Sequence, residues 1–204
     1  MVSRASLVVA VSTVAMLLSA CTPTASSSPS GTPVSAPPTV ASASPTPTPT
    51  PTQTWSTVEQ AAVAAVDAYK AAARRIENDP AAFTEKQMKA ILTKVAGPEV
   101  VKANVGSYLD LKKRGFRYSG VSVPVMTVSH GATDVEYATQ VIVTRCNDQR
   151  GVKVLDKHGR EVDEATLGYE LPEFNMRQYV VQKRKGETHF RVYGLGKGSG
   201  SCGP

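Results

Sequence analysis

The chain contains 204 residues, with 23 Lys and Arg against 17 Asp and Glu, and its formal net charge is +6. The charge excess is mild and no nucleic-acid-binding motif is recognisable, so composition argues against nucleic acid as a partner. The three cysteines form no CxxC motif or Cys/His cluster, so the sequence favours neither a metal site nor a cofactor.

The first 21 residues have the pattern of an export signal. Arg4 gives a small positive region, and Leu7–Leu18 gives an uncharged, mostly apolar stretch of 12 residues. That stretch is too short to span a bilayer, which needs roughly 20 residues. Leu18-Ser19-Ala20-Cys21 then supplies the small residues that a processing peptidase requires, with a cysteine at the end.

This segment resembles the lipobox signal peptide of bacterial lipoproteins. The resemblance implies that residues 1–20 are removed and that Cys21 receives a diacylglyceryl group. Cys21 would then be the first residue of the mature protein and its anchor in membrane lipid, on the extracytoplasmic face of the cell membrane. The alternative is an ordinary secretory signal with a chance cysteine.

Residues 22–54 consist almost entirely of Pro, Thr, Ser, Ala and Val and carry no charged side chain. Such a segment cannot bury enough apolar surface to offset its ordering entropy, so we expect a disordered linker. With Cys21 it would form a tether over residues 21–54, reaching roughly 100 Å if fully extended at ~3.1 Å per residue. The folded domain is expected at residues 55–204, a length sufficient for one core.

The domain should open with three helices. Ser56-x-x-Glu59 and Thr84-x-x-Gln87 read as capping boxes, which mark the starts of the first two helices. Asn78-Asp79-Pro80 should end the first helix and Gly97-Pro98 the second, while Pro98–Arg114 should form the third before a glycine C-cap.

Apolar side chains at spacings of three and four predict the buried faces of these helices. The predicted buried residues are Ala62, Val66, Tyr69, Ala73 and Ile76, then Met88, Ile91, Leu92 and Val95, then Val101, Val105 and Tyr108. The polar residues expected away from the first stripe are Asp67, Lys70, Arg74 and Glu77.

From residue 116 the apolar period changes to two, which predicts strands. Residues 121–125 alternate around Pro124, which indicates an edge strand or a bulge. Alternation over residues 135–146 predicts one long strand. The remaining expectations are a short hairpin at 152–162, an irregular stretch at 163–175, and a hairpin of 178–183 with 188–193 around Lys185-Gly186.

Three helices followed by about four antiparallel strands predict an α+β fold in which the sheet buries one face on the helices. This element order, with the alanine-rich first helix, the strand end at Cys146 and the closing strands around Arg177 and Phe190, resembles the nuclear transport factor 2-like, cystatin-like cone. It resembles in particular the actinobacterial lipoproteins that carry such a domain on a Pro/Thr-rich tether. The resemblance implies that the N-terminal helices pack on a curved antiparallel sheet, and it covers residues 55–204.

Cys146 and Cys202 remain as a pair once Cys21 is assigned to the anchor, in a compartment that permits disulfides. Both lie outside the apolar patterns, one at a strand end and one in the Gly/Ser-rich tail. We therefore predict a disulfide that holds the tail on the sheet.

In catalytic members of the cone family, an acid or base with a shifted pKa lies between sheet and helices. Asp110 beside Tyr108, and the pair Asp156 and His158, are the best acid/base candidates here, although a solvated helix position and a solvated loop explain them more simply. The other polar candidates are the strand residues Tyr137 and Thr139 and the turn or strand-end histidines His130 and His189.

No catalytic motif is recognisable, so the sequence favours a membrane-anchored, non-catalytic binding or spacer module at the cell envelope. The alternatives are a small cone-fold enzyme of isomerase or cyclase type, or a phage- or plasmid-encoded exclusion lipoprotein. An open cone predicts a small apolar ligand. A filled cone predicts an envelope protein as partner, on the outer sheet face or at the basic runs near Lys112 and Lys183.

Overall fold

A computed structural model describes residues 54–199 and 202, which fall within the unit Thr50–Pro204. The predicted signal peptide, Cys21 and nearly all of the tether lie outside the described residues. Within the described part of the chain, no helix combines the length and apolar character that crossing a membrane would need.

Helix α1 (Thr57–Asn78) begins and ends where the sequence predicts. Ser56 and Glu59 form the expected capping box, in which each side chain bonds the backbone amide of the other residue. Asp79 and Pro80 end the helix and lead into the 3-10 turn η1 (Pro80–Ala82). The predicted apolar stripe is buried along the whole helix.

Helix α2 (Glu85–Leu92) starts at the predicted Thr84 capping box but ends before Val95, which is only half-buried. Helix α3 (Pro98–Arg114) follows, and Gly115 ends it with φ 69°, the left-handed conformation that glycine adopts at low cost. The basic residues of its last turn lie beside the unsatisfied helix carbonyls, where positive charge is favourable.

The sheet is antiparallel and four-stranded, in the order β2-β3-β5-β6. Its strands are β2 (Val123–Val135), β3 (Ala138–Asp148), β5 (Phe174–Arg184) and β6 (Arg191–Lys197). A second, two-stranded sheet pairs β1 (Arg117–Ser119) with β4 (Lys153–Leu155), and the single helical turn α4 (Glu164–Leu167) lies between β4 and β5. The expected α+β order, helices before an antiparallel sheet, is thus confirmed.

The predicted long strand over 135–146 is wrong at its start. The chain turns at Glu136-Tyr137, so Val135 closes β2 and the next strand begins at Ala138. The apolar alternation runs through this turn without a break, and therefore periodicity could not reveal it. His130-Gly131, expected at a strand end, lies inside β2 at a register shift, with Gly131 at φ 82°.

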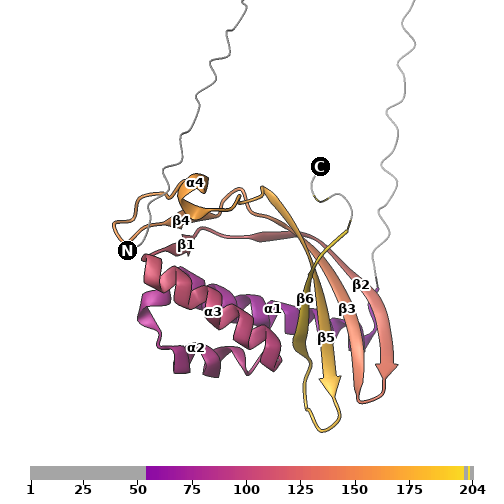
Figure 1. Cartoon of the computed structure of the whole chain (residues 1–204). Helices are drawn as coiled ribbons and strands as arrows, with labels where there is room; N and C mark the ends of the chain where they lie inside the picture. The colour runs from indigo at the N-terminus through magenta and orange to yellow at the C-terminus, as the bar shows by residue number, and fades with distance from the viewer. Residues whose placement is uncertain (1–53, 200–201, 203–204) are drawn as a thin grey trace, which may run out of the picture. The chain divides into compact units, whose positions relative to one another are not determined.

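Helices α1 to α3 lie on the concave side of the bent sheet (Figure 1). The core joins their inner faces to β3, β5 and β6 through Val141, Val143, Val181 and Val192, each fully buried. Val135 is 38% exposed because it ends the edge strand β2.

Candidate ligand-binding cleft

A cleft of about 540 Å³ opens between α1, α3 and the sheet, at the end of the domain that carries β1 and the loop before β5. Its volume falls within the range of small-molecule sites, about 300–1,000 Å³. Its walls come from eight parts of the chain: α1, α3, β1 with the loop that follows it, β3, the loop between β3 and β4, the loop 169–172, β5 and β6. The core valines fill the space deeper between the layers.

Five tyrosines line this cleft: Tyr69, Tyr108, Tyr118, Tyr169 and Tyr179. The rings of Tyr69 and Tyr179 meet edge to face, with centroids 6.2 Å apart. The Tyr69 hydroxyl accepts a 2.7 Å hydrogen bond from Asn104 Nδ2, so its own proton is free to be donated. The hydroxyls of Tyr118 and Tyr169 lie 2.8 Å apart and share one hydrogen bond.

Burial raises the pKa of Tyr69 to about 12 and also raises the pKa of Tyr108, Tyr118 and Tyr179. These phenols therefore stay protonated at neutral pH. They act as hydrogen-bond donors, whereas a general base would need a pKa near the working pH.

The charged lining residues come mainly from one face of α1, where Lys70, Arg74 and Glu77 are half-buried. Arg74 Nη1 lies 3.8 Å from Glu77 Oε2, and its other terminal nitrogen donates to the Gly120 carbonyl. The sequence predicts these side chains away from the apolar stripe, and they are not among the buried residues of α1. They line the cleft together with the β1 segment and the loop before β5.

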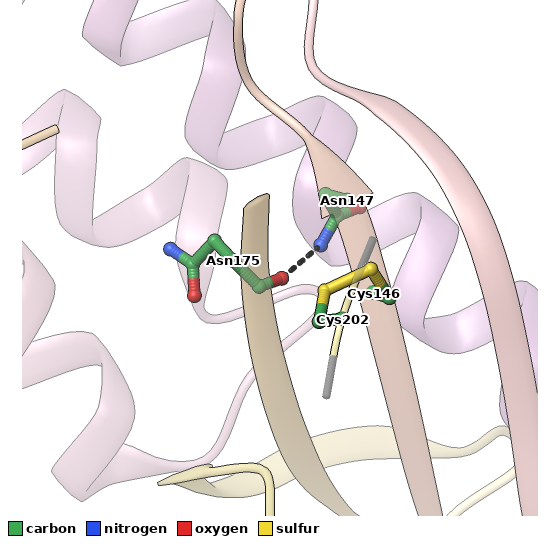
Figure 2. The surroundings of a disulfide bond; sticks show 4 residues. All are labelled: Cys146, Asn147, Asn175 and Cys202. Atoms are coloured by element: carbon green, nitrogen blue, oxygen red, sulfur yellow. Dashed lines mark hydrogen bonds between the residues drawn. A yellow bond between two sulfur atoms is a disulfide. The ribbon is translucent and has the colours of Figure 1, made fainter. Parts of the chain in front are cut away.

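The cleft floor is joined to the disulfide through one strand. Cys146 and Cys202 form the predicted disulfide, with their Cα atoms 5.6 Å apart. The next residue, Asn147, points to the other face of β3 and is 3% exposed in the cleft lining. Its Nδ2 donates to the Asn175 carbonyl at 3.4 Å (Figure 2).

The acid/base candidates from the sequence do not gather here. Asp110 is exposed on α3 and lies 3.7 Å from Arg114, whereas its neighbour Tyr108 does reach the cleft. Asp156 binds Arg160 within the turn that follows β4, and His158 lies in the same turn.

The remaining sequence candidates lie on other parts of the domain. His130 Nε2 lies 2.8 Å from the Thr144 hydroxyl, and Thr139 donates to Asp134 beside the β2-β3 turn. His189 Nε2 lies 3.2 Å from the Lys94 carbonyl, and Tyr137 is 63% exposed. Tyr118, Tyr169 and Asn104 were missed because nothing in their local pattern marks them.

Two further hollows are less polar than the cleft. A groove of about 750 Å³ lies between α2, α3 and the β5-β6 hairpin, and its two carboxylates, Glu85 and Glu187, are each paired with a cation. A third hollow, of about 400 Å³, lies along the outer alanines of α1, residues 61–68, beside Phe190. Neither hollow has the convergent hydroxyl groups of the cleft.

The basic run at the end of α3 has intramolecular partners. Lys112 Nζ donates to the Phe83 carbonyl at 2.7 Å, and Arg114 donates to the carbonyls of Thr166 and Leu167. These bonds tie α3 to the segments beside it. These bonds give the basic run a structural role. Binding of an envelope protein, which the sequence analysis considered for this run, is a separate role.

No protein-family model and no curated protein matches this chain. Among solved structures, the chain is similar to the intermembrane space region of the chloroplast protein ARC6, with 9% identity and a TM-score of 0.47, over 68% of this chain and 95% of that one. It is also similar to a de novo designed β-sheet protein, with 14% identity and a TM-score of 0.31, over 70% and 92% of the two chains. Likenesses at these scores support no statement about function.

Proposed function

We propose that this protein is a membrane-anchored lipoprotein whose domain, a nuclear transport factor 2-like cone, binds a small ligand in the tyrosine-lined cleft without turning it over. Cys21 holds it on the extracytoplasmic face of the cell membrane, and residues 22–54 act as the tether. The proposal for the anchor is supported by the lipobox pattern of Leu18–Cys21.

The single observation that supports binding is the set of five tyrosines converging on one cleft. Four of them have raised pKa values, so the wall offers protonated donors and aromatic faces. Such groups orient a ligand but make poor bases at neutral pH. For an open cone the sequence predicts a small apolar ligand. The cleft lining combines polar and apolar side chains, so we instead expect a ligand that carries polar groups.

Affinity capture tests this proposal. The full chain is purified in detergent from membranes, and extracted small molecules are identified by mass spectrometry. Tyr69→Phe and Tyr118→Phe should each retain less ligand, since each removes a cleft hydroxyl and keeps the ring. Tyr137→Phe, at the exposed β2-β3 turn, is the matched control and should retain as much ligand as the wild type. Equal retention by all four proteins would reject the cleft as the site.

The anchor is tested separately with Cys21→Ala. Acyl chains contribute about 0.8 kcal/mol per buried methylene, so loss of lipidation should move the protein from the membrane fraction to the soluble fraction. A Cys21→Ala protein that remained in the membrane would place the anchor elsewhere.

A further inference from the structure

The cleft wall carries more positive than negative charge. On α1, Asp67, Lys70, Arg74 and Glu77 follow one another at spacings of three and four and so lie along one side of the helix. Opposite them, Arg145 of β3 and Arg177 of β5 are direct neighbours across the sheet. The cleft lining itself holds three cations, Lys70, Arg74 and Arg177, against two carboxylates, Glu77 and Glu170. The Arg145–Asp67 ion pair lies beside this lining.

The two carboxylates of this side of α1, Asp67 and Glu77, are already engaged. Asp67 accepts a 2.6 Å bond from Arg145, whose side chain is 6% exposed, and Glu77 lies 3.8 Å from Arg74. Within residues 54–199 and 202, Lys70 and Arg177 have no carboxylate within ion-pair distance. Glu170, the other carboxylate of the lining, is exposed and forms no ion pair with either cation.

Lys70 is half-buried among like charges. Burial lowers its pKa, and the charges of Arg74, Arg177 and Arg145 lower it further, against the opposing effect of Glu77. A buried charge is normally paired, because an uncompensated charge loses its hydration without recovering it elsewhere. Next to Arg177 on the sheet, Nε of Arg145 is buried without a hydrogen-bond partner among the described residues. Within the part of the chain that the structure describes, Lys70 is therefore the half-buried cation of this wall that lacks a paired negative charge, and Arg177 is exposed beside it at the same cleft.

We infer that the cleft binds a small molecule carrying an anionic oxygen-acid group, a carboxylate or a phosphate, which pairs with Lys70 and Arg177. The tyrosine hydroxyls then bond the polar body of the same ligand, beginning with Tyr69, whose proton is free. This inference rests on the proposed function and names the ligand class for it. A free anion and an anionic lipid headgroup share this chemistry.

Calorimetric titration of the full chain in detergent micelles tests the inference. The probes are inorganic phosphate and acetate at constant ionic strength, and micelles containing phosphatidylglycerol. Hydrogen bonds to charged groups are worth about 1.5–3 kcal/mol, so Lys70→Met and Arg177→Gln should each weaken anion binding roughly 10- to 100-fold. Lys102→Met and Arg184→Gln, cations of the groove beside α2, are matched controls and should bind like the wild type.

Lys70→Met should fold without the anion, because it removes an uncompensated charge and keeps the aliphatic stem; an unchanged or higher melting temperature checks this. Binding of free anions, or of the lipid micelles alone, that depends on Lys70 and Arg177 supports the inference and identifies the source. Absence of binding to all probes, or equal weakening by the control variants, overturns it. If ligand capture still depends on Tyr69 and Tyr118 but not on Lys70, the proposed function stands and the anionic class fails.

Discussion

At residue 97 the chain has no space for a side chain. A Cβ atom built on Gly97 would lie 2.4 Å from the Tyr193 ring, well inside van der Waals contact. This close approach lets α3 start directly against β6, where the Gly97 amide bonds the Val192 carbonyl at 2.8 Å. The sequence marked Gly97 only as a helix breaker, since its contact with Tyr193 joins residues far apart in the chain.

Gly97→Ala should therefore lower the free energy of unfolding by about 1–3 kcal/mol, the usual cost of overpacking. The control is Gly106→Ala, in the middle of α3, where no atom lies within 4 Å of the added carbon. That change should stabilise the protein by up to about 1 kcal/mol through helix propensity. Urea unfolding measures both, and equal effects of the two substitutions would contradict the packing argument.

Asp156, an acid/base candidate from the sequence, stabilises a turn by accepting hydrogen bonds within it. The backbone amide of Arg160 makes the largest contribution, and with the Arg160 guanidinium and the His158 amide it lowers the pKa of Asp156 from 3.8 to about 2. Because the folded pKa lies below the unfolded one, this carboxylate stabilises the turn above pH 4. Its contribution is lost as the pH falls toward 2.

Arg160→Gln removes the side-chain contacts and keeps the backbone bond, so the pKa of Asp156 should rise partway toward 3.8. Carbon-detected NMR of labelled aspartates follows this titration. Arg150→Gln, which removes the partner of Asp148, is the control and should leave Asp156 unchanged. A pKa of Asp156 above its usual value would instead revive the acid/base reading of this residue.

At the scale of elements, the features that could be predicted are those determined by residues close together in the sequence. Ser56 and Thr84 marked two helix starts because a capping box is complete within four residues. The Glu136-Tyr137 turn went undetected because neither residue is a typical turn former and the apolar alternation continues through it. The pairing of β1 with β4 was also unpredictable, since two strands of three residues carry almost no periodic signal.

The disulfide fixes the C-terminal tail to β3, and its removal should be costly. It closes a loop spanning a sequence separation of 56 residues. In the chain-entropy model such a loop is worth about 4 kcal/mol. The double variant Cys146→Ser/Cys202→Ser should lose about this much stability in urea, and the reduced wild type should match it. A loss below about 1 kcal/mol would show that the unfolded chain is little constrained by the bond.

At the scale of the whole molecule, the sequence predicted the layers but not the cleft. Tyr69 and Tyr108 were correctly placed on buried helix faces, yet their spacing could not show that they share a cavity with Tyr118 and Tyr169. Lys70 and Glu77 were placed away from the apolar stripe, but the pattern could not show that they line a cleft, since the segments opposite them lie about 40 to 100 residues away in the chain. Convergence of distant segments is a tertiary property that local periodicity does not contain.

Limited proteolysis of the full chain in detergent should cut first within residues 22–54, because a segment without a core is open to protease. Mass spectrometry should then identify a stable fragment beginning near Trp55. A broad-specificity protease is needed, since the segment has no charged residue for trypsin. Early cleavage inside residues 55–199, with the tether intact, would reverse the proposed arrangement.

Helix α1 is in use on three sides: the core stripe, the charged wall of the cleft and the alanine hollow beside Phe190. An ordinary surface helix has one exposed side on which substitutions accumulate freely. Its variable positions therefore recur with the helical period. In α1 this periodic variation should be weak, because the small, charged and apolar positions each tolerate few substitutions, for different reasons. Drift in this protein should therefore be slow along all of residues 57–78 and faster on the outer side of α3, around Ala103 and Ser107, which face neither the core nor the cleft.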